Sequence, residues 1–189
     1  MLMIIIANRR TSLEKLQQQH ASAAILDVTS RGPEPWQRFS PFYPHGGISV
    51  PFSPGYVSAS VEGIWQGLKV FEQADIDPAR FTNVTMKRLK RSARTYGRVL
   101  GHRQGVAGAR LLPYAEARRT IYLPSYHWVL TNKLQDLLAE IQDRALEQGV
   151  VLLDYETNCD LDNLAAPLSH AGLIKRYLEG KWPGDEERE

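Results

Sequence analysis

The residues best suited to chemistry lie in the stretch 58–71. Read at the helical period, this stretch places Glu62, Gln66 and Lys69 in one row, at i, i+4 and i+7. A carboxylate can activate water or stabilise a developing cation, and an amide and an ammonium beside it can position it. Trp65 lies next to the row. The stretch therefore predicts a helix that presents a carboxylate, an amide, an ammonium and an indole together.

The same stretch has the apolar pattern of a helix packed on a core. Ser60 is a favourable N-cap, and we expect the helix to end near Ala74. The apolar stripe consists of Val61, Ile64, Trp65, Leu68 and Phe71. Two interpretations are open: the polar row is the solvated face of an ordinary amphipathic helix, or it faces a ligand.

A proline-rich segment, residues 31–56, precedes this helix. Prolines at high density exclude long regular elements, whereas disordered linkers are poor in aromatic residues. We therefore expect an ordered loop, with residues 48–52 as a short edge strand. The loop either forms a site or only wraps the core. Its aromatic residues are Trp36, Phe39, Phe42, Tyr43, Phe52 and Tyr56.

The strongest cluster of positive charge follows the central helix. We expect a helix over residues 83–96, and its outer faces are either solvated or bind phosphate on a nucleotide or a nucleic acid. The glycine-rich stretch 97–108 adds His102 and Arg103 as candidate ligands of phosphate or carboxylate, although its spacing matches no phosphate-binding motif. The basic residues of the expected helix are Lys87, Arg88, Lys90, Arg91 and Arg94, with Arg98 just beyond.

Length and composition limit the class of protein. The chain has 189 residues, 43% hydrophobic and 23% charged, which is typical of a globular fold. A net charge of +2 excludes a protein that is basic throughout, so any nucleic-acid-binding surface is local. The single cysteine, Cys159, excludes an internal disulfide and a zinc site made of cysteines alone. We predict one globular domain over residues 1–183 and a disordered tail at 184–189.

The N-terminus carries an apolar run that is too short for the core of a signal peptide, and its positive charges follow the run. No segment of the sequence approaches the roughly 20 apolar residues of a membrane span. We therefore expect a soluble, cytoplasmic protein without a membrane partner.

Three apolar runs, near residues 2–7, 24–28 and 150–154, are predicted as strands of a small sheet. A helix that begins at Thr11 or Ser12 connects the first two, which makes these strands parallel. The fold class is therefore α+β: predominantly helical, with a small sheet and a long ordered loop. Later helices are expected over residues 113–122, where the pair Leu123-Pro124 ends the helix, 126–148 and 171–178.

Polar residues cluster after the last predicted strand. Asp154 ends that strand, which is a common position for a catalytic carboxylate and also for a cap. The acidic alternation at 156–163, which includes Asp160, lacks the glycine and the terminal glutamate of a calcium loop. Ser169 and His170 begin the final helix, as an N-cap beside a surface histidine or as part of a site. No nucleophile-elbow motif supports serine hydrolysis.

A sequence pattern in the first half of the chain resembles the NADAR (YbiA-like) family of N-glycosidases. That family has an aromatic, proline-bearing loop followed by a helix of the form T-V-E-H-x-x-Q-A-x-K-F. The matching residues are Ser60-Val61-Glu62, Trp65-Gln66 and Lys69-Val70-Phe71, preceded by Phe39-Ser40-Pro41-Phe42. The order of long helix, short strand, acidic loop and last helix is also similar, whereas the family's D-x-x-W-G-x-G motif is replaced by Asp160-Leu161-Asp162-Asn163.

The resemblance implies hydrolysis of an N-glycosidic bond in a ribose-phosphate nucleotide or an ADP-ribosyl adduct, through an oxocarbenium-like transition state. Glu62 then stabilises the cation or activates water, and Gln66 and Lys69 position it or the ribose hydroxyls. Asp154 or Asp160 supplies a second carboxylate, and no metal or cofactor is required. The expected substrate-binding residues are Trp36, Phe42 and Tyr43 for the base, His102, Arg103 and the basic helix for phosphates, and also Ser169 and His170.

A second hypothesis is a non-enzymatic module that binds a nucleotide or nucleic acid through the basic helix, residues 87–98. Its binding would weaken steeply with salt. A third hypothesis is a structural or partner-binding domain whose polar rows are solvated. Burial of Glu62 in a pocket would count against this third hypothesis, because an unpaired buried carboxylate is costly. The basic residues of the second hypothesis are Lys87, Arg88, Lys90, Arg91 and Arg94.

Overall fold

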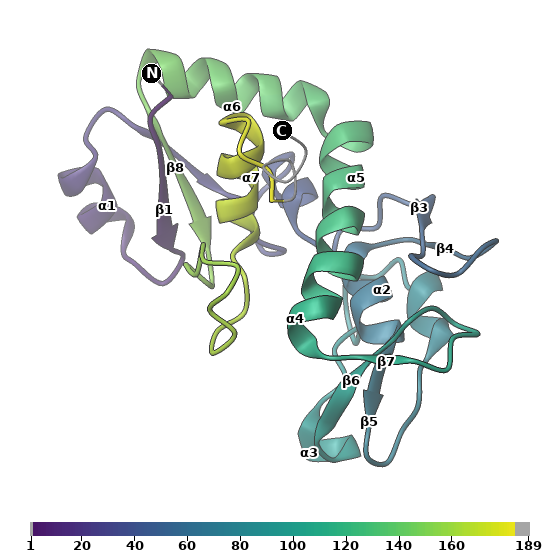
Figure 1. Ribbon diagram of the computed structural model, residues 1–189. Helices are drawn as coiled ribbons and strands as arrows, with labels where there is room; N and C mark the ends of the chain where they lie inside the picture. Colours follow the sequence, from purple (N-terminus) through teal and green to yellow (C-terminus); the bar gives the residue numbers. More distant parts are fainter. Residues whose placement is uncertain (1, 184–189) are drawn as a thin grey trace. The chain divides into compact units, whose positions relative to one another are not determined.

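A computed structural model describes residues 2–183 (Figure 1). Helices and strands are mixed along the chain, which confirms the predicted α+β class. The described residues form two compact units: the terminal unit, from residues 2–40 and 134–183, and the central unit, Pro41–Lys133. One domain over residues 1–183 stays a prediction, and the predicted disordered tail at 184–189 lies outside the described residues.

The terminal unit contains the three predicted strands in one sheet. β1 (Ile4–Asn8), β8 (Val150–Asp154) and β2 (Ala24–Asp27) lie in the order β1-β8-β2. Both outer strands run parallel to β8, so the predicted parallel arrangement of the first two strands is confirmed. β8 is buried along its whole length, as an apolar central strand should be.

Helices complete the terminal unit. α1 (Leu13–Gln19) starts at the Ser12 N-cap, whose hydroxyl accepts from the backbone N–H of Lys15. Leu16 of α1 packs on Val151 and Leu153 of β8. The other helical elements of this unit are the 3-10 turn η1 (Trp36–Phe39), α6 (Gln135–Glu147) and α7 (His170–Leu178), which contacts β1 and β8.

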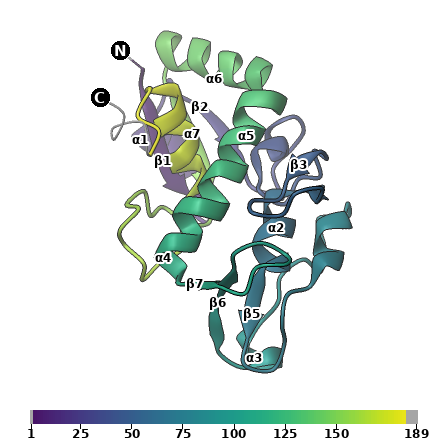
Figure 2. The same cartoon turned by 45° about the vertical axis from the view of Figure 1, so that its right-hand side comes forward.

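The central unit is built around α2 (Val61–Gly67), which leads into a three-stranded antiparallel sheet (Figure 2). That sheet has the order β5 (Lys69–Phe71), β6 (Val99–Arg103), β7 (Leu111–Leu112). A second sheet pairs β3 (Ile48–Ser49) with β4 (Val57–Ser58). The connecting turns and helices are η2 (Pro78–Thr82), α3 (Ala93–Tyr96) and α4 (Tyr114–Ala117).

The predicted central helix is wrong in its length. Its start at the Ser60 N-cap is confirmed, since the serine hydroxyl accepts from the backbone N–H of Gly63 at 3.0 Å. The helix ends at Gly67, where a Cβ atom would lie 2.3 Å from the ring of Phe81. The next residues form β5, which pairs with β6. Lys69 therefore stands on a strand and not in a helical row.

The predicted helix over residues 83–96 is also wrong. Only Ala93–Tyr96 is helical, and Met86 and Arg88 have positive φ angles of 59° and 56°. The Asn83 side chain bonds the backbone of the residues that follow it. Such side-chain bonds compete with the hydrogen bonds of a helix. The basic residues therefore lie on an irregular segment.

The predicted helix over residues 126–148 is divided into two helices. α5 (Leu123–Lys133) and α6 are separated at Leu134, whose backbone angles of −127° and 14° are not helical. Pro124 does not end a helix, because α4 continues through the π-helical turn η3 (Arg118–Tyr122) into α5. Pro124 has no N–H for an α-helical bond, and the π turn before it changes the hydrogen-bonding pattern at this place.

The proline-rich segment 31–56 forms short elements. It contains η1 in the terminal unit and β3 in the central unit, so the division between the units falls within it, after Ser40. The edge strand expected at 48–52 is confirmed only for Ile48–Ser49. The aromatic residues of this segment therefore belong to two different units.

Candidate functional site

Glu62 lies in the first turn of α2 and is buried, with 7% of its surface exposed. Its Oε1 accepts a hydrogen bond of 2.8 Å from Gln66 Nε2, one helical turn later. Burial raises the pKa of the Glu62 carboxyl, while the Gln66 bond and the charges of Lys69 and Lys90 act to lower it. The burial of this carboxylate counts against a solvated polar row on α2.

The Gln66 amide is held at both ends. Its Nε2 donates to Glu62, and its Oε1 accepts from the backbone N–H of Arg91 at 3.0 Å. Each partner fixes which end of the amide faces it, because a carboxylate only accepts and a backbone N–H only donates. The donor that meets Glu62 is therefore oriented by a residue 25 positions further along the chain than Gln66.

Arg91 is a buried structural cation and not part of an exposed basic face. Its guanidinium donates to the Gln66 carbonyl at 3.3 Å and to the Lys69 and Asp75 carbonyls at 2.7 Å each. It also lies over two aromatic rings. These bonds hold the junction between α2 and β5, and they use the donors that a phosphate would need.

Lys69 is the first residue of β5 and is half-buried. Its ammonium lies 5.9 Å from the centre of the Trp65 ring. Burial lowers the pKa of the Lys69 ammonium, the Glu62 carboxylate opposes this, and the charges of Lys90 and Arg91 add to it. Among the described residues, Lys69 and Glu62 interact through their charges without forming an ion pair in contact.

His102 lies opposite Lys69 in the β5–β6 pair, and its ring contacts that of Trp65 in a tilted arrangement, with 3.7 Å between the ring centres. It is 1% exposed, and neither ring nitrogen has a hydrogen-bond partner within residues 2–183. Burial, together with the Lys69 charge, lowers the pKa of His102 from 6.5 to about 3. The Trp65 backbone acts to raise this pKa, but more weakly. The imidazole is therefore neutral near pH 7 and does not supply the positive charge expected for phosphate binding.

The Arg103 guanidinium already has protein partners. Its Nη2 bonds to Asp75 Oδ1 at 2.6 Å, and its Nη1 donates to the Ala109 carbonyl at 3.5 Å. The bond from Arg103 holds the pKa of the Asp75 carboxyl below its usual range, with a contribution from the Ile76 backbone. Arg103 is therefore less available to a phosphate than its place in a glycine-rich stretch indicated.

The three aromatic residues predicted to stack on a base lie in different units. Phe42, in the central unit, lies 5.6 Å from the Lys90 ammonium, and Tyr43 packs against a neighbouring histidine. Trp36 belongs to the terminal unit, where it is buried and stacks on Phe39. Of the three, Phe42 contacts Lys90, and the charge of Lys90 acts on the Glu62 carboxyl.

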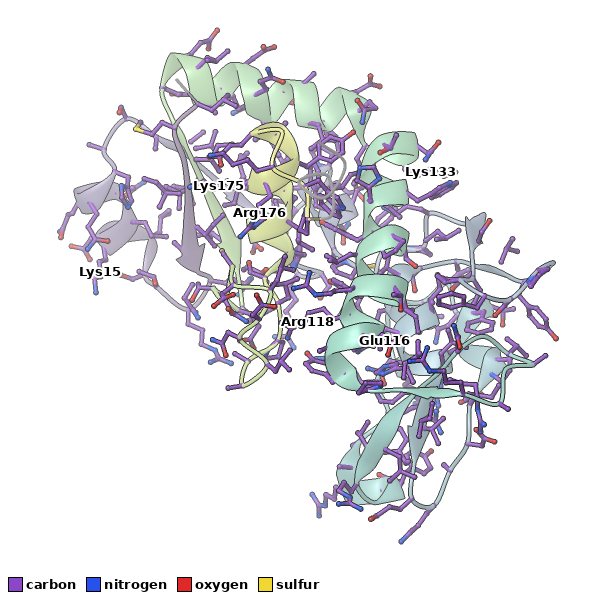
Figure 3. All side chains as sticks on the ribbon, in the orientation of Figure 1. Lys15, Glu116, Arg118, Lys133, Lys175 and Arg176 are labelled. Atoms are coloured by element: carbon purple, nitrogen blue, oxygen red, sulfur yellow. The ribbon has the colours of Figure 1, made fainter. Side chains whose placement is uncertain are left out.

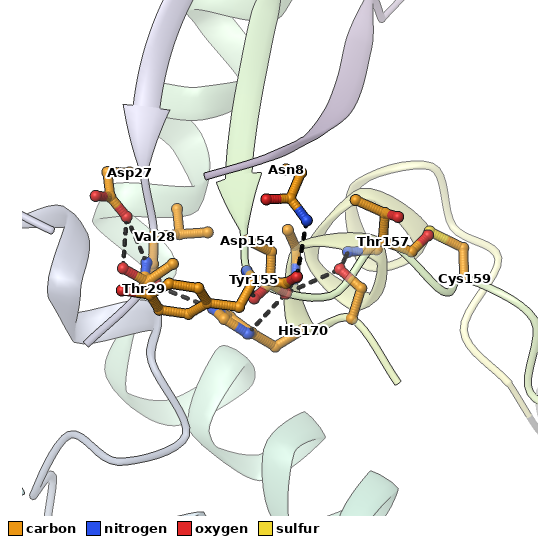
Figure 4. Close-up of polar contacts among 12 residues, drawn as sticks. Asn8, Asp27, Val28, Thr29, Asp154, Tyr155, Thr157, Cys159 and His170 are labelled. Carbon is orange, nitrogen blue, oxygen red and sulfur yellow. Dashed lines mark hydrogen bonds and ion pairs between the residues drawn. The ribbon is translucent and has the colours of Figure 1, made fainter. Parts of the chain in front are cut away.

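Asp154 belongs to a buried polar cluster at the end of β8 in the terminal unit (Figure 4). Its Oδ2 accepts from Ser169 Oγ at 2.9 Å and from the backbone N–H of Ala171 at 3.2 Å, and it lies 2.9 Å from His170 Nδ1. Its Oδ1 accepts from the backbone N–H of Tyr155. With both oxygens bonded, Asp154 acts as a cap and an ion-pair partner, and its catalytic role stays a prediction.

The interpretation of His170 as a surface residue is wrong, because the side chain is buried. Its Nε2 lies 2.9 Å from the Val28 carbonyl, and its Nδ1 faces Asp154. Both partners accept hydrogen bonds, so the ring is held as an imidazolium. Although burial opposes both charged forms, the pairing raises the pKa of His170 and lowers the pKa of Asp154. Ser169 caps α7, which is one of the two roles considered for it, and its hydroxyl accepts from the backbone N–H of Gly172.

Asp160 is exposed in the loop before α7, where its Oδ1 accepts from the backbone N–H of Asp162. Both candidates for a second carboxylate, Asp154 and Asp160, belong to the terminal unit, whereas Glu62 belongs to the central unit. Across residues 2–183, no group of three or more His, Cys, Asp or Glu side chains is placed to hold a metal ion.

The basic segment, residues 83–96, contains no Asp or Glu. Arg98, just beyond it, pairs with Glu72 at 3.3 Å. Lys90 is the member of the segment whose charge reaches Glu62. Four residues of the segment are exposed and have no acidic partner in the described part of the chain, namely Lys87, Arg88, Lys90 and Arg94.

A third arginine, Arg118, belongs to η3 and was not among the candidate site residues predicted from the sequence (Figure 3). It is buried, donates to the Tyr114 hydroxyl at 3.0 Å and lies over the Tyr114 ring. Tyr114 in turn meets the Trp65 ring edge-on at 5.8 Å. The sequence carries no signal for this role, because Arg119 next to it has the same chemistry.

A family model described as "Family of unknown function (DUF6939)" matches residues 8–174 of the chain. The matched range contains Glu62 and its partners in the central unit and the Asp154 cluster in the terminal unit. No curated protein and no solved structure matches the chain. Over residues 2–183, none of the helices has both the length and the apolar character needed to cross a membrane.

Proposed function

The chain belongs to this family of unknown function, and we propose that its central unit hydrolyses an N-glycosidic bond. The substrate is a ribose-phosphate nucleotide or an ADP-ribosyl adduct, with Glu62 as the key carboxylate. The observation that carries the proposal is the arrangement at Glu62: a buried carboxylate, an amide held in one orientation, and a lysine whose charge reaches the carboxylate without contact. The resemblance of this stretch to an N-glycosidase pattern supports the same reaction.

The reaction requires negative charge next to the anomeric carbon. As the C–N bond breaks, its electron pair leaves with the base, and positive charge develops on C1 and the ring oxygen. Ionised Glu62 stabilises this cation and accepts a proton from the attacking water as the C1–O bond forms. That proton passes through solvent to the departing base, which leaves neutral.

Two neighbours prepare Glu62 for this role. Gln66 donates to Oε1 and so fixes the direction of the carboxylate. The Lys69 ammonium opposes the effect of burial on the pKa of Glu62 and so favours the ionised form that the reaction needs. The residues of the terminal unit take no part in this scheme.

Release of free base, followed by mass spectrometry, tests the proposal. The substrates are ribosylamine phosphates, NAD-type dinucleotides and nucleic acid that carries ADP-ribosylated guanine. We expect wild type to release base, and Glu62→Gln to be slower by roughly 10²–10⁴-fold. Glu72→Gln, the same charge change at an exposed residue of the same unit, should keep full activity. No release from any substrate, or equal release by Glu62→Gln, would contradict the proposal.

The basic segment favours a second candidate function, the binding of a nucleotide or nucleic acid without catalysis. The observation behind it is the exposed positive charge of Lys87, Arg88 and Arg94, which has no acidic partner in the described residues. Anisotropy of a labelled single-stranded oligonucleotide should show binding that weakens steeply with salt. Reversing these three charges should abolish binding, whereas Glu62→Gln should not. Binding that is insensitive to salt would remove this candidate.

A further inference from the structure

Two lysines near Glu62 carry positive charge that the described residues do not neutralise. Lys69 and Lys90 each interact with the charge of Glu62, and the Lys90 charge also acts on Lys69. Neither lysine forms an ion pair in contact with an acidic residue of the described chain. Two ammonium charges therefore act on one carboxylate, which leaves a local excess of positive charge.

The neighbouring arginines are already engaged. Arg91 donates to backbone carbonyls, Arg103 bonds to Asp75, and Arg80 bonds to Asp77. The two lysine ammonium groups lie instead over aromatic rings, those of Trp65 and Phe42. A cation held over a ring keeps its N–H donors for an anion. Among the cations whose charge acts on Glu62 or Lys69, the two lysines are therefore the ones whose donors the described residues leave available.

His102 gives a second, independent indication of a ligand. It lies opposite Lys69, is 1% exposed, and has no hydrogen-bond partner for either ring nitrogen within residues 2–183. A buried polar group without a partner is costly, and native proteins keep few of them. A neutral imidazole offers one N–H donor, which complements an anion held at Lys69.

We propose that Lys69 and Lys90 bind a phosphate monoester of the substrate, close to Glu62. This inference rests on the proposed N-glycosidase function and narrows its substrate class to a ribose with a phosphate monoester, as in a ribose-phosphate nucleotide and not in an ADP-ribosyl adduct. Two ammonium groups suit a phosphate dianion, because lysine binds phosphate as a point charge without a fixed bidentate geometry. The phosphate then offsets the repulsion between the lysines, and the Glu62 carboxylate stays available for the sugar.

Calorimetric titration of the 189-residue chain with ribose 5-phosphate and with ribose tests the phosphate site. We expect ribose 5-phosphate to bind at least roughly tenfold more tightly than ribose, and Lys90→Gln to weaken it by about tenfold or more. Lys133→Gln is the matched control. Lys133 is also exposed in the central unit, and its ammonium lies 5.6 Å from the Trp128 ring, as that of Lys90 does from Phe42. This variant should bind ribose 5-phosphate like wild type.

An equal loss of affinity in Lys90→Gln and Lys133→Gln would indicate a diffuse charge effect and overturn the proposal. Equal affinities for ribose and ribose 5-phosphate would overturn it as well. Lys69→Met should cause a similar loss, and since Lys69 is half-buried, thermal unfolding must first show that this variant is folded. If Lys69→Met does not fold, the Lys90→Gln variant still decides the test, because Lys90 is exposed.

The assay of base release separates this inference from the proposed function. If wild type releases no base but binds ribose 5-phosphate through Lys90, the hydrolase proposal fails and the phosphate site stands. If base is released and Lys90→Gln leaves KM unchanged, the hydrolase stands and the phosphate site fails.

Discussion

At the scale of single residues, Gln66 connects the chemistry of Glu62 with the packing of the central unit. One end of its amide donates to the carboxylate, and the other accepts from the backbone of Arg91. This glutamine could be assigned as a partner of Glu62 from the sequence, because a spacing of four residues places both side chains on one helical face. Its second partner could not be assigned, because no local pattern links it to position 91.

Replacing Gln66 by Met removes both bonds at nearly constant volume. We expect the free energy of unfolding to fall by about 1–3 kcal/mol, because a buried acceptor and a buried donor lose their partner. The pKa of Glu62 should rise further, so the acidic limb of the activity profile should move to higher pH. Urea unfolding and a pH–rate profile measure the two effects. Gln73→Met, at an exposed position, should change neither.

His102 leads to a prediction of the opposite sign. His102→Phe keeps a ring against Trp65 and removes two buried nitrogens that lack partners in the described chain. We expect the free energy of unfolding near neutral pH to increase by about 1–3 kcal/mol, and the affinity for ribose 5-phosphate to fall. Urea unfolding measures the free energy of unfolding, and calorimetry measures the affinity. A less stable variant with wild-type affinity would contradict both expectations.

The pH dependence of stability follows from the lowered pKa of His102. Between about pH 6.5 and about pH 3 the unfolded chain binds a proton at this residue, whereas the folded protein does not. The contribution of neutral His102 to the free energy of unfolding is therefore fully present above the pKa of the unfolded chain, about 6.5. It is lost as the pH falls, by up to about 1.4 kcal/mol per pH unit. Urea unfolding at several pH values should show a shallower decline for His102→Phe. Parallel declines would contradict this assignment.

At the scale of elements, the junction between α2 and β5 places Glu62 and Lys69 in one cluster. A helix through Lys69 fits the sequence equally well, because Val70 and Phe71 continue the apolar stripe. The strand forms instead because Lys69 pairs with His102 and because Arg91 binds the carbonyls on both sides of the junction.

Arg91→Lys tests this junction. A lysine keeps the charge, but it cannot reach several carbonyls with a planar fork of donors. We expect the free energy of unfolding to fall by about 2–4 kcal/mol, since buried carbonyls lose their partners, and base release to fall with it. Arg94→Lys, the same change at an exposed position of the same segment, should be neutral. Equal stability of both variants by urea unfolding would contradict the role of Arg91.

The connection between β8 and α7 depends on the Asp154–His170 pair. Asp154→Asn should lower the free energy of unfolding by about 3–5 kcal/mol, because it leaves His170 buried without its counter-charge. The raised pKa of His170 adds stability that is fully present below about pH 6.5 and is lost as the pH rises through the folded pKa. The lowered pKa of Asp154 adds stability that is lost as the pH falls through its folded value.

Unfolding measured between about pH 6 and about pH 9 separates this pair from His102, whose effect lies below about pH 6.5. Wild type should lose stability toward the alkaline end, and His170→Phe should not. An alkaline decline of the same size in His170→Phe would contradict the assignment.

At the scale of the whole molecule, the two units differ in how many segments of the chain form them. The central unit is one continuous segment, whereas the terminal unit combines both ends of the chain. In its sheet, β1 and β2 each pair with β8 and not with each other. The order of the strands in space therefore differs from their order in the sequence.

A chain that ends at Gly149 lacks β8 and tests this organisation. We expect β1 and β2 to lose their pairing, because each of them bonds to β8. The signals of Trp65 and its ring neighbours in the central unit should remain. Backbone NMR and hydrogen exchange measure both outcomes. A protected β1–β2 pair in the shortened chain would contradict the sheet order.

The sequence by itself determined the features that depend on neighbouring residues. Apolar runs located the three strands of the terminal sheet, hydroxyl residues located the caps at Ser12, Ser60 and Ser169, and helical spacing paired Glu62 with Gln66. Each of these depends on a few consecutive side chains and on the period of the backbone.

Only the tertiary structure decided which charged residues are buried and which are available. Arg91 and Lys90 are adjacent and alike in the sequence, yet one binds carbonyls 16–25 positions earlier and the other lies exposed over Phe42. His102 became a neutral, buried ring because β6 pairs with β5 beside Trp65. Burial and long-range pairing set the charge and the partners of such groups, and a local sequence pattern contains neither.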